Sequence, residues 1–78
     1  MERLASATLD VREMQCAQAL AQAGVAMKGL APGAVLELLC NAEDVKRDLF
    51  VWAKALGHTV VGTEEGPEDT RLRIRRGP

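Results

Sequence analysis

Aromatic side chains are nearly absent from this 78-residue chain, which has one Trp, one Phe and no Tyr. Proteins that recognise single-stranded nucleic acid stack its bases on aromatic side chains, so the composition argues against that class of function. The formal net charge is −1, which gives the chain as a whole no attraction to nucleic acid or to an anionic membrane. We therefore expect no direct nucleic-acid binding.

Long apolar runs and metal-binding patterns are lacking too. No uninterrupted apolar segment approaches the roughly 18–20 residues that span a bilayer, and the residues after Met1 lack the apolar core of a signal peptide. These absences predict a cytoplasmic protein without membrane attachment, whose thiols are free or transiently modified. The two cysteines, Cys16 and Cys40, and the single His58 match no common zinc-ligand spacing. We expect no metal and no other cofactor.

The rest of the composition is typical of a small globular protein, with 47% hydrophobic and 27% charged residues. We interpret residues 1–78 as a single domain with a folded core from about residue 8 to residue 76. Hydrophobic periodicity and turn residues predict six elements. These are a strand at 8–11, a helix from 16, a strand at 34–40, a helix from about 42 to 56, and strands at 58–63 and 70–75.

The order βαβαββ predicts an α+β two-layer sandwich, in which a four-stranded mixed sheet carries both helices on one face. Alternation places Leu36, Leu38 and Cys40 of the second strand, and Leu72 and Ile74 of the last strand, on the face that meets the helices. The first helix is expected to pack through Leu20 and Met27 and to stop at Gly29. In the second helix the expected apolar stripe is Val45, Leu49, Trp52 and Leu56, between an Asn41 cap and a stop at Gly57.

Alternation also predicts a row of basic side chains, Arg71, Arg73 and Arg75, on the opposite sheet face. Such a row could bind an acidic protein surface or a phosphate backbone, or could simply be solvated. Phe50 falls off the helical stripe and could mark a partner-binding patch, although single exposed apolar residues are common. His58 has no sequence-adjacent catalytic partner, so we interpret it as a strand-entry residue.

Cys16 lies where the first extended segment changes to helix, and two helix starts compete there. If Asp10 and Glu13 form a capping box, the helix begins near Val11 and Cys16 lies more than a turn inside it. If residues 8–11 form a strand, Cys16 is at or next to the N-cap, where free N–H groups and the helix dipole favour a thiolate. A buried, unreactive cysteine is the further alternative.

Cys40 is a possible second thiol. A right-handed βαβ crossover makes the first two strands parallel, so Cys16 and Cys40 are expected at the same end of the sheet. They could form a redox pair, although the position of Cys40 on the core face favours burial.

Five short segments resemble the TusA/SirA-like family of small, bacterial-type sulfur carriers in both residue type and spacing. They are Thr8-Leu9-Asp10, Cys16, Ala31-Pro32-Gly33, Arg47-Asp48 and Ile74-Arg75-Arg76-Gly77. The resemblance implies a SirA-like fold. It also implies that Cys16 carries a persulfide, received from a cysteine desulfurase-like donor protein and relayed to an acceptor protein, which would make the chain a sulfurtransferase.

The chain departs from that family at the residues around the thiol. Ala17 and Ala19 stand where the Cys-Pro-x-Pro motif has its prolines, and Glu13-Met14 stand where Gly-Leu is common. Proline at the first helical turn prevents the helix from extending backward, whereas alanine does not. Glu13 adds a negative charge near the thiol, which disfavours an anionic sulfur. The alternative function is therefore an adaptor of the same fold that binds protein partners but no longer transfers sulfur.

Overall fold

The computed structural model describes residues 6–77 and confirms the predicted order of elements. The third strand runs two residues further than the pattern predicted, and the last strand has the predicted bounds. The elements are β1 (Ala7–Asp10), α1 (Cys16–Lys28), β2 (Val35–Cys40), α2 (Glu43–Ala55), β3 (Thr59–Glu65) and β4 (Thr70–Arg75).

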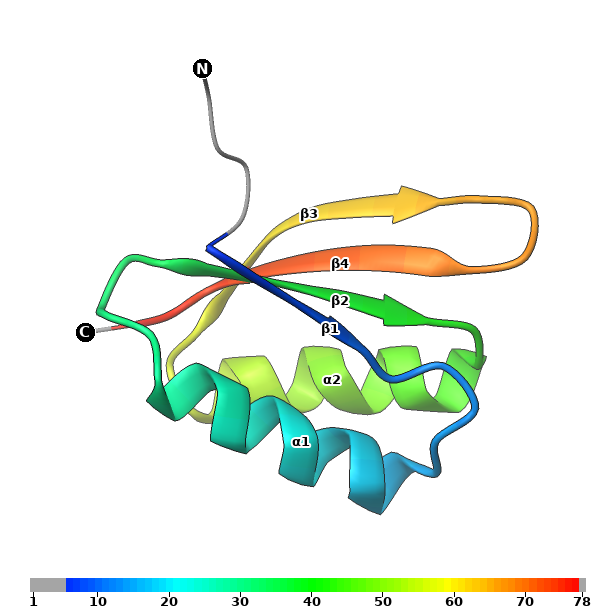
Figure 1. Cartoon of the computed structure of the whole chain (residues 1–78), viewed down its shortest axis with the longest axis horizontal. Helices are drawn as coiled ribbons and strands as arrows, with labels where there is room; N and C mark the ends of the chain where they lie inside the picture. The colour runs from blue at the N-terminus through cyan, green and yellow to red at the C-terminus, as the bar shows by residue number, and fades with distance from the viewer. Residues whose placement is uncertain (1–5, 78) are drawn as a thin grey trace.

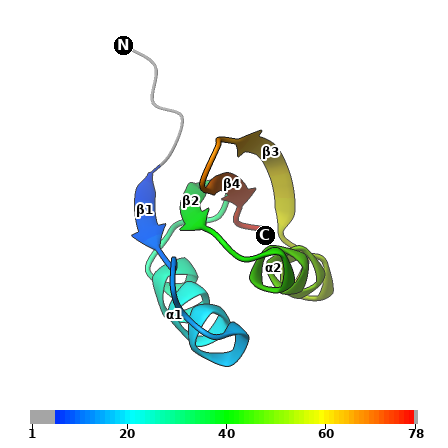
Figure 2. The ribbon, with the colours of Figure 1, turned by 90° about the vertical axis from the view of Figure 1, so that its right-hand side faces the viewer.

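The four strands form one mixed sheet in the order β1-β2-β4-β3. β1 and β2 are parallel, while β4 pairs antiparallel with both β2 and β3. Figures 1 and 2 show both helices on the same face of this sheet, as predicted. The central strands, β2 and β4, therefore have one face covered and one face open.

The hydrophobic core lies between the sheet and the two helices. The sheet contributes the side chains that alternation placed on its helix-facing side. α1 contributes two alanines, whose small side chains let the helix approach the sheet closely. Each fully buried leucine contributes about 1.5–3 kcal/mol of transfer free energy. The core residues of the sheet are Leu36, Leu38, Cys40, Leu72 and Ile74, and those of the helices are Ala19, Ala23, Met27, Val45, Leu49 and Ala53.

One predicted core position at the end of the second helix was wrong. Leu56 is 59% exposed, because α2 ends at Ala55 and the chain turns away at Gly57, where φ is +82°. Ala53 occupies the buried position instead. In α1 Leu20 and Met27 pack against the core as predicted, with Leu20 only partly buried, and Ala19 and Ala23 are fully buried beside them.

Asn41 does not cap α2, contrary to the prediction. The N-cap is Ala42, which makes no side-chain hydrogen bond to the helix. The Asn41 Oδ1 instead accepts a hydrogen bond of 3.1 Å from the backbone N–H of Glu13, in the loop before α1. The Asn41 side chain therefore makes a tertiary contact instead of the helix cap that the local sequence predicted.

The C-terminal residues Arg76 and Gly77 are held beside the ends of both helices. The Arg76 guanidinium donates to the carbonyl of Leu30, and the Gly77 N–H donates to Nδ1 of His58 at 2.9 Å. The His58 ring lies 5.6 Å from the Trp52 ring, centroid to centroid. His58 thus has a structural contact at the entry to β3. A Cβ on Gly77 would overlap the carbonyl oxygen of Gly57.

Gly77→Ala is expected to lower the free energy of unfolding by about 1 kcal/mol, because the tail must give up its hydrogen bond to His58 to avoid the overlap. Gly24→Ala is the matched control. It lies inside α1, a Cβ there would meet nothing within 4 Å, and the change should stabilise the protein by about 0.5–1 kcal/mol. The urea concentrations at the unfolding midpoints of the two variants and of the wild type measure these differences in stability. Equal midpoints for Gly77→Ala and the wild type would contradict the packing described for the tail.

Candidate functional site

The C-terminal ends of β1 and β2 and the N-terminal ends of both helices meet at one edge of the molecule. The strands are parallel, so the loop after Asp10 and the loop after Cys40 leave the sheet on the same side. α1 begins at Cys16 and α2 at Glu43, which places both helix N-termini at this edge (Figure 1). Open α/β sheets commonly bind their ligands at such an edge.

The structure decides between the two possible starts of α1. Asp10 is the last residue of β1 rather than a helix cap, so the Asp10–Glu13 capping box does not form. The N-cap is Gln15 and Cys16 is the first helical residue, as the strand alternative predicted. Cys16 is partly buried and lies against the edge of the core.

The loop before Cys16 is fastened at several points. The Arg12 guanidinium donates two hydrogen bonds to the Asp10 carboxylate, at 2.9 and 2.8 Å, and one to Asp69 of the β3–β4 hairpin, at 3.1 Å. The bonds to Arg12 lower the pKa of Asp10 to about 2. Val11 is buried, and its N–H donates to the carbonyl of Leu39 at 2.8 Å. The loop is therefore held to β2 and to the hairpin.

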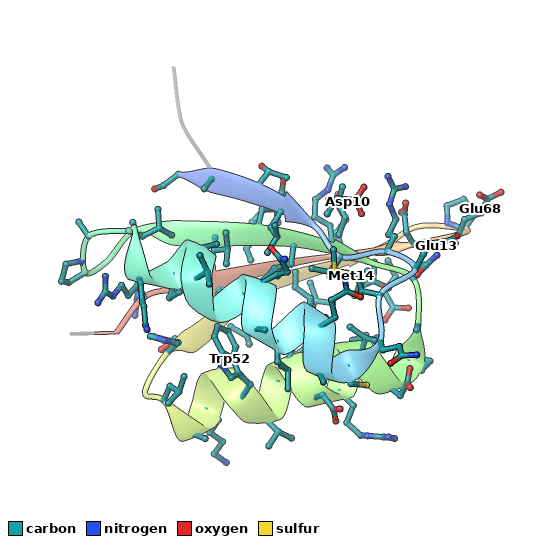
Figure 3. All side chains as sticks on the ribbon, turned by 60° about the horizontal axis from the view of Figure 1, so that its bottom comes forward. Asp10, Glu13, Met14, Trp52 and Glu68 are labelled. Carbon is teal, nitrogen blue, oxygen red and sulfur yellow. The ribbon has the colours of Figure 1, made fainter. Side chains whose placement is uncertain are left out.

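Glu13 adopts a left-handed backbone conformation in this loop, with φ of +67°. A side chain with a Cβ pays a conformational cost there that glycine avoids. The resemblance to TusA-like proteins, which commonly have glycine at this position, makes Glu13 a less suitable residue for this turn than the one common in the family. Figure 3 shows Glu13 and Met14 in the segment between the end of β1 and α1.

Two carboxylates from α2 face the Cys16 thiol. The Sγ donates a hydrogen bond to Oδ2 of Asp44 at 3.6 Å. The nearby Asp48 carboxylate is the largest cause of the raised thiol pKa, followed by desolvation and the charge of Asp44, and together they raise the pKa of Cys16 to about 11. A helix N-terminus favours a thiolate, but here the opposing carboxylates outweigh it. Cys16 is therefore a protonated thiol at neutral pH.

Cys40 ends β2 inside the core and is 1% exposed, as the alternation predicted. Burial raises the pKa of its thiol. Both cysteines are free thiols. Cys16 is thus the more accessible of the two, and a redox pair between them stays a prediction.

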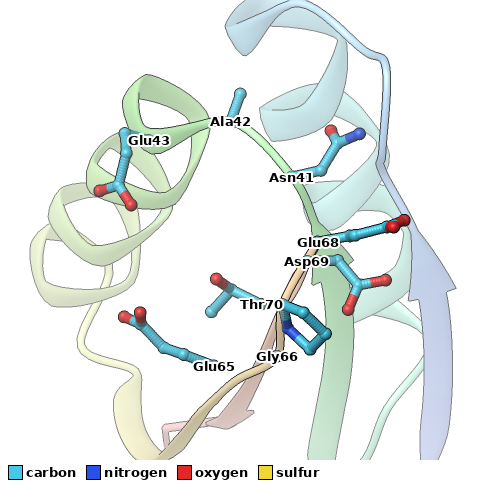
Figure 4. Close-up of a pocket in the computed structure, with 9 residues that line it drawn as sticks. Asn41, Ala42, Glu43, Glu65, Gly66, Glu68, Asp69 and Thr70 are labelled. Carbon is cyan, nitrogen blue, oxygen red and sulfur yellow. The ribbon is translucent and has the colours of Figure 1, made fainter.

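Acidic side chains surround the same edge. A pocket of about 190 Å³ lies between the start of α2 and the β3–β4 hairpin. Figure 4 shows Glu43 and Glu65 on one side of this pocket and Glu68 and Asp69 on the other. Lys46 forms ion pairs with Glu65 and, at 4.0 Å, with Glu43. Within residues 6–77 no cluster of three or more Cys, His, Asp or Glu could hold a metal ion.

The predicted arginine row is present, and carboxylates of the neighbouring strands offset the charges of Arg71 and Arg73. Arg71 and Arg73 lie 3.7 and 3.3 Å from the Glu37 carboxylate of β2. They lie 3.9 and 3.4 Å from Glu64 of β3. These ion pairs leave little excess positive charge for a phosphate backbone. In the part of the chain that is described, no helix is long and apolar enough to cross a bilayer.

Glu13→Gly is expected to raise the free energy of unfolding by about 0.5–1 kcal/mol, because glycine adopts the left-handed conformation without the Cβ penalty. Glu13→Ala is the control. It removes the same carboxylate but keeps the Cβ, and it should give no such gain. Thermal or urea unfolding measures both variants, and an equal gain for alanine would assign the effect to charge rather than to the backbone.

Comparison with known proteins identifies the family of this chain. A model of the family described as Sulfurtransferase TusA matches residues 7–76. The chain is also 34% identical over 73 residues to a Bacillus subtilis (strain 168) protein named "Putative sulfur carrier protein YrkF". That match covers 94% of this chain and 40% of the relative, so the chain spans less than half the length of that protein. The family match extends over almost every described residue, and it shows that this chain belongs to the TusA sulfurtransferase family.

Proposed function

We propose that the chain is a sulfur carrier in which Cys16 holds a persulfide, taking its sulfur from a donor protein and passing it to an acceptor protein. The observation that carries this proposal is the position of Cys16 as the first residue of α1, at the C-terminal edge of the parallel strands. This is the position at which TusA-like carriers keep their reactive cysteine. A reducing cytoplasm fits the proposal, since both thiols are free.

The transfer is a thiol exchange without net oxidation. Cys16 loses its proton, and its sulfur attacks the outer sulfur of a donor persulfide. The donor S–S bond breaks as the new S–S bond forms. The outer sulfur stays on Cys16, and the inner sulfur of the donor leaves with the electron pair and takes up a proton. In the second transfer an acceptor thiolate attacks the outer sulfur of the Cys16 persulfide in the same way. No cofactor is needed for either step.

Accessibility favours Cys16 over Cys40 as the carrier. Both reactions require a partner sulfur to reach the thiol in line with the bond that breaks. Cys40 is 1% exposed beneath the helices, whereas Cys16 is partly exposed at the molecular edge. Loading of Cys40 would require the core to open.

Incubation with a cysteine desulfurase and cysteine should add the mass of one sulfur atom to the wild type, and dithiothreitol should remove it. Cys40→Ala should still be loaded, and Cys16→Ala should not. Intact-protein mass spectrometry measures the adduct, with another TusA-family protein loaded in parallel as a positive control. An adduct that persists in Cys16→Ala would assign the carrier role elsewhere.

An adaptor without sulfur transfer is the second candidate, and the two carboxylates that face Cys16 favour it because they suppress the thiolate. For an adaptor, no adduct forms on the wild type while the control protein is loaded. Partner binding in a pull-down would then survive Cys16→Ala.

A further inference from the structure

We propose that Asp44 and Asp48 decide which sulfur donors Cys16 accepts, rejecting anionic donors and favouring a donor protein that brings a positively charged group to the reacting sulfur. This inference rests on the proposed carrier function of Cys16. It assigns a specificity role to two residues of α2, whereas the carrier function itself requires only the thiol.

The two aspartates are placed to act on the thiol together. They are four residues apart on α2, so they lie on the same side of the helix, one turn apart. α1 and α2 lie side by side beneath the sheet, with their N-termini at the same edge (Figure 2). The Asp44 Oδ2 accepts the hydrogen bond from Cys16, and its Oδ1 accepts one from the N–H of Val45 at 2.9 Å. This second bond orients the Asp44 carboxylate.

The neighbouring charges leave the two carboxylates uncompensated. The first turn of α1 has no acidic residue, and the carboxylates that raise the pKa of the thiol are both on α2. Arg12 is bound to Asp10 and Asp69, and Lys46 to Glu65 and Glu43. Arg47 forms no ion pair with either aspartate among residues 6–77. A cation supplied by a partner would be the missing counter-charge.

The consequence for donor choice follows from Coulomb's law. An anionic persulfide approaching Cys16 meets the Asp44 carboxylate, which is hydrogen-bonded to the sulfur it must contact, and the Asp48 carboxylate one turn further along α2. Attack also needs a thiolate, and the pKa of about 11 leaves roughly a hundredfold less of it than the ordinary value of 9.0 would. A cationic group placed beside Asp44 and Asp48 is attracted to the site and lowers the cost of the thiolate. Free Cys16 is thereby kept unreactive until such a donor binds.

The test compares two methanethiosulfonate reagents with the same reactive group, one carrying a trimethylammonium group and the other a sulfonate. The rate ratio is the rate of the trimethylammonium reagent at Cys16 divided by the rate of the sulfonate reagent, measured by peptide mass spectrometry. This ratio should fall by about tenfold or more in Asp44→Asn/Asp48→Asn relative to wild type. The pH midpoint of the reaction should also shift from about 11 toward 9.0. Glu43→Gln is the matched control, since it removes one charge from the same helix turn without touching Cys16.

An unchanged rate ratio in the folded double variant would overturn the proposal. Circular dichroism checks the fold, and the single variants replace the double one if it is unfolded. Added salt offers a measurement without any variant, because screening should reduce the wild-type ratio toward that of a small free thiol. A wild-type ratio insensitive to salt also counts against the proposal.

A final arm separates this inference from the carrier function itself. Glutathione persulfide is an anionic donor, and its sulfur should load the double variant at least several-fold faster than the wild type. If the desulfurase loads the wild type but both proteins take sulfur equally fast from glutathione persulfide, the carrier function holds and the role of the aspartates fails. If neither protein is ever loaded by any donor, the carrier function fails.

Discussion

The parallel pairing of β1 with β2 is the constraint on which the candidate site depends. Its register aligns Ala7 with Leu36 and Asp10 with Leu39, so both strands run out of the sheet at the same edge. Parallel neighbours cannot be joined by a tight turn, and the chain must cross through α1. The crossover brings the start of α1 back to the edge where β2 passes into α2. Cys16 and Asp44 meet for that reason, although 28 residues separate them in the sequence.

Alternation predicted the central strands well because each has one face under the helices and one face open. Leu36, Leu38, Leu72 and Ile74 are all fully buried, as a period of two requires. Predictions failed where an element ends. Leu56 was assigned to a helical stripe, but the helix stops one residue earlier and its angular spacing no longer applies. Helix periodicity carries no information about where the helix itself terminates.

The position of the candidate site was predictable and its electrostatics were not. Local sequence places Cys16 beside a helix N-terminus, which favours a thiolate. The carboxylates that reverse this preference belong to the other helix, so they become neighbours only after the sheet has formed. Asn41 illustrates the same limit, because its amide serves the loop before α1 rather than its own helix. The element order alone could have predicted that these carboxylates lie near Cys16, because a βαβα order brings the first turns of both helices to one edge of the sheet.

The helix start survives without the prolines that TusA-like proteins have after the cysteine. Ala17 would allow α1 to extend backward, yet the helix begins at Cys16. Tertiary contacts, in place of proline, keep α1 from extending backward beyond Cys16. The Glu13 backbone is left-handed and its N–H is bound to Asn41, so residue 13 cannot join a right-handed helix without losing both features. The ion pairs of Arg12 with Asp10 and Asp69 hold the preceding residues in place. The contacts of the loop before α1 thus fix the start of the helix at Cys16 in a chain that has alanine where the family motif has proline.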